Sequence, residues 1–114
     1  MTVSKTKTHN FPPPTVDVSV DEVNRTTASF TINTNNASDY VYALLPAAET
    51  IADAEALFER GPVRYFEGEK TVKVDLNDLA GDTEYNLYVA VRNINPLVYS
   101  DLASEVIDTH VPYT

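Results

Sequence analysis

The sequence predicts an all-β sandwich, and three features indicate this fold class. Several short runs alternate between apolar and polar residues, which is the pattern of strands with one buried face. Polar turns separate these runs, and about seven such strands are typical of two stacked sheets. The 114 residues are 43% hydrophobic, enough for one ordinary core. We therefore expect one sandwich domain over residues 15–114, preceded by an extended N-terminal arm over residues 1–14.

The expected strands follow one another at short intervals. Residues 16–21 and 28–32 alternate cleanly and are joined by a polar stretch around Asn24. Residues 40–45 are apolar on both faces, which predicts a central strand covered from both sides. Further strands are expected at 63–67, 71–76, 85–91 and roughly 103–110.

One short helix is expected over about residues 50–60, between two strands. Its apolar residues recur at helical spacing, at Ile51, Ala54, Leu57 and Phe58. Thr50 and Asp53 form a capping-box pattern at its start, and Gly61 followed by Pro62 is a stop signal. We expect the apolar stripe to cover one edge or end of the sandwich.

Charge is distributed unevenly along the chain. Residues 1–14 hold Lys5 and Lys7 and no acid, and since the net charge of the chain is −9, the rest carries −11. An acidic body repels phosphate backbones, so a nucleic-acid partner is not expected. No apolar run is long enough to span a bilayer, so we expect no membrane insertion.

The residues give no support for enzymatic chemistry or for a cofactor. Cysteine is absent, which excludes disulfides and thiolate sites. The imidazoles are His9 in the arm and His110 near the end, and no Gly-x-Ser-x-Gly turn accompanies them. The acidic stretch 75–86 fails the calcium-loop pattern, because Leu79, Ala80 and Asn86 occupy its fifth, sixth and twelfth positions. A weak surface calcium site stays open as an alternative.

The stretch 76–91 resembles the E-to-F strand region of fibronectin type III domains, which belong to the immunoglobulin-like sandwiches. The matching residues are Leu76, Leu79, the run Thr83-Glu84-Tyr85, Leu87, Val89 and Val91. The resemblance implies that Tyr85 forms a structural tyrosine corner, its hydroxyl reaching the backbone of the preceding loop. The chain departs from the family in lacking tryptophan, and Phe30 is placed at that core position. The helical insert is a second departure.

A more particular resemblance comes from residues 28–32, 40–45 and the helix that follows them. This combination is similar to modules of gut bacterial surface lipoproteins. The start of the chain, Met1 to Lys7, lacks the apolar stretch of a secretory signal, which favours a protein used without export over one whose signal was removed. Phages of such hosts carry sandwich proteins of this kind on their capsids. By analogy, the resemblance implies a capsid auxiliary protein.

Two segments are candidates for binding another protein. In the arm, Phe11 and the prolines can lie in a partner's groove while Lys5 and Lys7 meet acidic groups. The loop expected between strands F and G, residues 93–99, presents Ile94, Leu97, Val98 and Tyr99. In an equally supported reading, Leu97 and Val98 fold back over the core.

The expected function is that of a non-enzymatic structural or binding protein. The first hypothesis is a phage capsid decoration protein, located on the virion and present in multiple copies. It would dock on a capsid protein through the arm and loops. The alternative is a protein- or glycan-binding module at a bacterial cell surface. Whether decoration would serve particle stability or host adhesion stays open.

Overall fold

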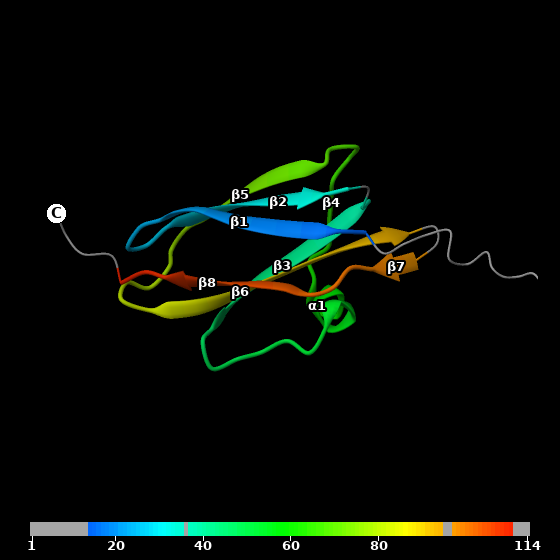
Figure 1. Ribbon diagram of the computed structural model, residues 1–114. Coiled ribbons are helices and arrows are strands. Elements are labelled where there is room, and N and C mark those ends of the chain that lie inside the picture. The colour runs from blue at the N-terminus through cyan, green and yellow to red at the C-terminus, as the bar shows by residue number, and fades with distance from the viewer. Residues whose placement is uncertain (1–13, 36, 95–96, 111–114) are drawn as a thin grey trace, which may run out of the picture.

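The computed structural model describes residues 14–35, 37–94 and 97–110, which form two antiparallel sheets packed face to face (Figure 1). The three-stranded sheet has the order β1 (Val16–Val23), β2 (Ala28–Thr34) and β5 (Thr71–Leu76). The five-stranded sheet has the order β4 (Arg64–Tyr65), β3 (Asp39–Pro46) and β6 (Glu84–Ile94), followed by β7 (Leu97–Tyr99) and β8 (Ala103–Asp108), which both pair with β6. The predicted all-β sandwich is confirmed.

The space between the sheets holds the larger core. Phe30 and Ile32 of β2 are fully buried and face Leu87 and Val89 of β6, which are also fully buried. The ring of Phe30 meets that of Tyr42 edge-on, with 5.4 Å between centroids. Alternate residues of each strand point into this space, as the period of two in the sequence requires.

The expected helix exists but is shorter than predicted. Helix α1 covers Ala54–Arg60, and its N-cap is Asp53, whose side chain accepts a hydrogen bond from the Ala56 N–H at 2.9 Å. The predicted cap at Thr50 is wrong, because the Asp53 carboxylate already satisfies a free N–H of the first turn. The helix ends at Gly61, whose positive φ of 58° suits a residue without a side chain.

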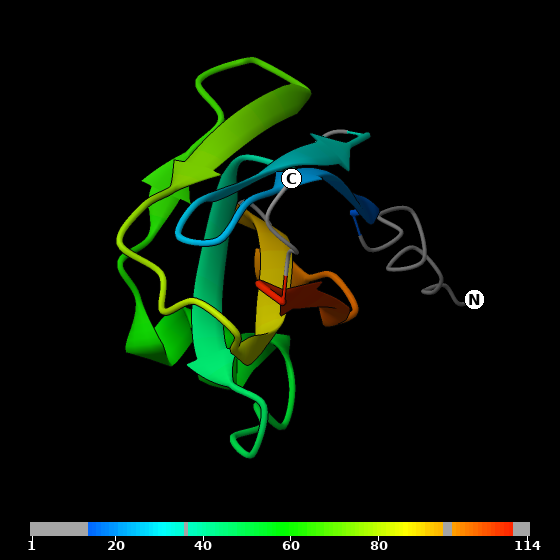
Figure 2. The same cartoon turned by 90° about the vertical axis from the view of Figure 1, so that its left-hand side faces the viewer.

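Helix α1 covers the outer face of the five-stranded sheet, not an edge or end as predicted. Leu57 and Phe58 pack against Val41 of β3 and Tyr88 and Ala90 of β6, forming a second buried cluster. Figures 1 and 2 both show β1, β2 and β5 on one side of β3 and α1 on the other. Because β3 is apolar on both faces, its outer side needs a cover, and the central strand covered on both sides is confirmed.

The outer face of the three-stranded sheet is polar. Residues Ser19, Glu22, Ser29, Thr31, Lys73 and Asp75 lie on it, in cross-strand register. Some are tied together by hydrogen bonds, such as Thr31 to the Asp21 carboxylate at 2.6 Å. Within the described ranges no helix covers this face.

Neither α1 nor any other helical segment of the described chain has the length and apolar character needed to span a bilayer.

Candidate docking surface

The segment expected as the F–G loop is a β-hairpin in its described part. Strand β6 continues to Ile94, and residues 97–99 form β7, with Ile94 paired to Leu97 and Arg92 paired to Tyr99. The prediction of a loop over residues 93–99 is therefore wrong for its described residues, Asn93, Ile94 and Leu97 to Tyr99. The residues of β7 are apolar or aromatic, and such side chains favour a sheet once a neighbouring strand is present.

Some residues of this segment are exposed, as a binding surface requires, and others are partly buried, as a cover over the core requires. Ile94 is 50% exposed and Leu97 is 55% exposed, whereas Val98 and Tyr99 are half-buried. The ring of Tyr99 packs against Phe58 of α1, with 5.5 Å between centroids. Ile94 and Leu97 are cross-strand partners, so their side chains lie on the same face of the hairpin and form one exposed apolar patch. We call Ile94 and Leu97 the hairpin patch.

A buried ion pair lies next to the hairpin. The Arg92 Nε donates to the Asp39 carboxylate at 3.0 Å, and Asp39 is only 2% exposed. The Arg92 guanidinium also lies over the Phe58 ring, 4.5 Å from its centroid, a favourable cation–π contact. Arg92 of β6 therefore contacts β3 and α1, two residues before Ile94 of the patch.

The arm leaves the sandwich beside this hairpin. Pro14, Thr15 and Val16 border a common hollow with Asp101, which follows β7 by two residues. Figure 1 shows the start of β1 and β7 at the same end of the molecule. The predicted arm residues Lys5, Lys7 and Phe11 lie outside the described residues. The structure therefore places the base of the arm at the same end of the molecule as the hairpin, an arrangement that the sequence did not predict.

Tyr85 lies at the opposite end of β6. Its hydroxyl accepts a hydrogen bond from the Ala80 N–H at 2.9 Å, which is the contact expected of a tyrosine corner. Sequence reasoning missed Thr109, which is fully buried beside it. The Thr109 hydroxyl donates to the Ala80 carbonyl at 2.7 Å and accepts from the Thr83 N–H at 2.9 Å. A buried threonine with two backbone partners closes this end of the sandwich.

The titratable groups at this end are exposed. The Asp108 carboxylate accepts a hydrogen bond from His110, and this bond raises the pKa of the His110 ring above its usual value. The carboxylates of Asp82 and Glu84 act in the same direction. In return, the backbone N–H and the ring of His110 lower the pKa of Asp108. Within the described residues, both hydrogen bonds of His110 go to Asp108, and none joins it to a hydroxyl group.

Within residues 14–35, 37–94 and 97–110, no group of three or more histidine and carboxylate side chains is placed to hold a metal ion. The acidic stretch that was tested as a calcium loop contains a tight turn, in which Asp78 and Asp82 have positive φ. A search with models of known protein families gives no match, and a search of curated proteins gives none either.

Proposed function

We propose that this protein is a non-enzymatic structural protein that docks on a partner protein through the hairpin patch and the arm. The observation that carries this proposal is the exposure of Ile94 and Leu97 on a paired hairpin at the end of the molecule where the arm begins (Figure 1). Apolar side chains that are buried on binding supply most of the affinity of a protein interface, provided that their positions are fixed in advance.

Several features support a fibronectin type III-like sandwich as the scaffold. The Tyr85 hydroxyl contact to Ala80 suits that family, as does the pairing of β3 and β6 in the sheet opposite β1, β2 and β5. Domains of this architecture bind through loops and hairpins at their ends, because these are free of core packing. The hairpin patch lies at such an end.

The partner that we propose is a phage capsid, on which the protein would be a decoration protein in multiple copies. This part rests on the resemblance of residues 28–32 and 40–45 to modules from gut bacterial surfaces, and on the basic arm, which can meet an acidic capsid surface. The alternative is a protein- or glycan-binding module of a bacterial cell-surface protein. Both functions use the same surface and differ in cellular location.

Fractionation of the native source separates the two functions. A density gradient followed by mass spectrometry should place the protein with a large particle that contains nucleic acid. Recovery in the membrane fraction would contradict the virion proposal and support the surface module.

Substitution of the patch tests the docking surface itself. Replacing both Ile94 and Leu97 by serine should weaken binding to the purified particle by about tenfold or more, because both side chains lose their apolar contact. The matched control is Val106→Ser, since Val106 is also 55% exposed but lies on β8, away from the hairpin. Equal binding by the double variant and the control would exclude the patch as the docking surface.

Deletion of residues 1–12 tests the arm separately. The truncated protein should bind the particle more weakly while its thermal unfolding is unchanged, because the sandwich begins after the arm. Full affinity after truncation would show that the arm has no anchoring role.

A further inference from the structure

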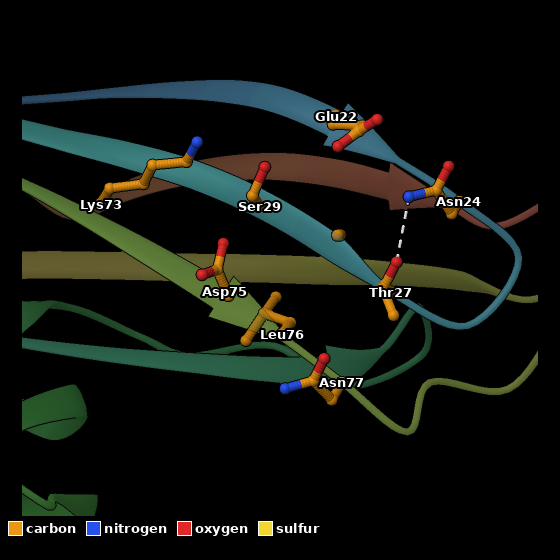
Figure 3. Close-up of a pocket in the computed structure, with 9 residues that line it drawn as sticks. Glu22, Asn24, Thr27, Ser29, Lys73, Asp75, Leu76 and Asn77 are labelled. Atoms are coloured by element: carbon orange, nitrogen blue, oxygen red, sulfur yellow. Dashed lines mark hydrogen bonds between the residues drawn. The ribbon is translucent and has the colours of Figure 1, made fainter.

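A hollow of about 320 Å³ lies on the outer face of the three-stranded sheet (Figure 3). Its centre is a row of three residues in cross-strand register: Glu22 of β1, Ser29 of β2 and Asp75 of β5. Lys73 borders the row on one side, and Asn24, Thr27 and Asn77 border it on the other. A hydroxyl is thus flanked by two carboxylates on a face that no described helix covers.

Ser29 is the unusual member of this row. It is only 8% exposed, and its hydroxyl has no hydrogen-bond partner among the described residues. A buried hydroxyl without a partner lowers stability, and such groups are rare in folded proteins. Figure 3 shows the Ser29 oxygen pointing out of the sheet, between Glu22 and Lys73. The hydroxyl is therefore positioned for a ligand that enters the hollow.

The charges of the row define the chemistry of that ligand. Glu22 and Asp75 offer carboxylate oxygens, and neither forms a salt bridge within the described chain. Lys73 borders the same hollow and forms no salt bridge to either carboxylate in the described chain, so Glu22, Asp75 and Lys73 together leave a net charge of −1. A primary ammonium carries three donors and no acceptor, which matches two carboxylates and one hydroxyl.

We propose that this hollow binds a lysine ammonium from the N-terminal arm of a second copy of the chain. The arm carries Lys5 and Lys7 and no acid, whereas the rest of the chain carries −11, so the two are complementary in charge. Lys5 and Lys7 are two residues apart, so in an extended chain their side chains point to the same side and both can approach the sheet face.

The arm begins at the end of β1 opposite to the hollow. Val16 opens the strand, and Glu22 lies about 20 Å further along it. The arm of the same copy would have to turn back along its own strand to reach the hollow, whereas the arm of another copy can approach it from outside. We therefore assign the ammonium to another copy.

Such a contact is head-to-tail. The arm starts at the Val16 end of β1, and the hollow lies near the other end, at Glu22. Two copies that exchange their arms would close a dimer, and arms passed from one copy to the next would form a larger ring or an open array. This contact between copies goes beyond the proposed docking on a particle and does not depend on the identity of that particle.

Sedimentation velocity of the purified full chain, without any particle, tests the proposal. Self-association should be present at low salt and should decrease at high salt, because charged surface contacts are screened. The variants Lys5→Gln/Lys7→Gln and Glu22→Gln/Asp75→Asn should each sediment as monomers. A mixture of the two variants should form dimers and nothing larger. The Lys5→Gln/Lys7→Gln chain keeps the hollow, and the Glu22→Gln/Asp75→Asn chain keeps the arm. The control Glu55→Gln/Glu59→Gln on α1 removes two negative charges, as Glu22→Gln/Asp75→Asn does, and should associate like the unchanged chain.

A peptide titration tests the hollow directly. A synthetic peptide of residues 1–11 should bind the full chain, and Ser29→Ala should weaken this binding by about tenfold while leaving stability unchanged or slightly raised. A merely structural hydroxyl would give no loss of binding. The proposal is overturned if the full chain is monomeric at all concentrations, or if a peptide with glutamine at both lysine positions binds equally well.

Discussion

The outer faces of the two sheets differ, although both sheets share one core. On the five-stranded sheet the outer face is apolar and lies under α1, with Val41, Leu57 and Ala90 almost free of solvent contact. On the three-stranded sheet the outer face consists of hydroxyl, amide and charged groups and stays open. The side chains on the outer face of a sheet, and not those in the shared core, therefore decide whether a helix packs on that sheet.

The two faces also treat charge differently. Asp39, under the covered face, is buried and paired with Arg92 at 3.0 Å. Glu22 and Asp75, on the open face, form no salt bridge within the described chain. Burial requires a charge to be paired, because an unpaired charge loses its hydration, whereas an open surface leaves charges available for a ligand.

The largest effect is expected from a change under the helix. Leu57→Ala should lower the free energy of unfolding by about 2–5 kcal/mol, because a fully buried leucine leaves a cavity between α1 and β3. Urea denaturation followed by circular dichroism measures this change. Glu59→Ala on the exposed side of the same helix is the control and should cost little. A small loss of unfolding free energy for Leu57→Ala would mean that packing of the helix on the sheet contributes little to stability.

The next effect concerns the buried ion pair. Asp39→Asn should lower the free energy of unfolding by about 1–3 kcal/mol, because Arg92 would keep its charge without a carboxylate partner. The loss stays moderate because the Arg92 side chain is 20% exposed and can gain some hydration. Asp75→Asn on the open face is the matched control. If both variants lost equal stability, the contrast between the two faces would fail.

A third change concerns the hydroxyl of Tyr85, which takes part in neither outer face. Tyr85→Phe removes the hydroxyl that accepts the Ala80 N–H, and it should cost about 0.5–1.5 kcal/mol. Thermal unfolding measures the loss. Tyr65→Phe is the control, since Tyr65 is largely exposed. A cost for Tyr85→Phe as small as that of the control would mean that water replaces the contact at no loss.

The smallest effect is expected at the exposed pair of Asp108 and His110. Because the folded pKa of His110 is raised, its contribution to stability is present below its unfolded pKa and is lost as pH rises through the folded value. Because the folded pKa of Asp108 is lowered, its contribution is present above its unfolded pKa and is lost as pH falls through the folded value. The pair therefore contributes most between the two unfolded pKa values.

NMR titration of the His110 ring checks this prediction. Asp108→Asn should shift the pKa of His110 back toward its ordinary value, while unfolding changes little, because solvent screens exposed pairs. A pKa of His110 that is the same in both proteins would show that the contact is absent in solution.

Much of the fold was predictable because strand periodicity is local. The alternation in residues 16–21 and 28–32 predicts β1 and β2 within a few residues, and the stop at Gly61 and Pro62 predicts the end of α1. The start of the helix was misplaced, because the capping-box pattern puts the cap at Thr50, whereas in the fold the Asp53 carboxylate accepts the Ala56 N–H. The hairpin was missed because β7 is a strand only through its pairing with β6.

The candidate sites were less predictable than the fold. The composition of residues 93–99 left two predictions open, an exposed binding loop or a cover over the core, and it did not show that Tyr99 turns to Phe58 while Leu97 stays open. The pairing of Asp39 with Arg92 joins positions 53 residues apart, and no local pattern connects them. The row of Glu22, Ser29 and Asp75 comes from three strands, and its register depends on the bulge between Val20 and Glu22.

The sequence by itself determined that this chain is an all-β sandwich with one short helix and an acidic body, because alternation, turns and charge are properties of neighbouring residues. Only the tertiary structure decided which face α1 covers, that the hairpin lies at the same end of the molecule as the base of the arm, and that Ser29 lies between two carboxylates. Those relations depend on cross-strand register and on the packing of one sheet against the other, which bring together residues far apart in the chain.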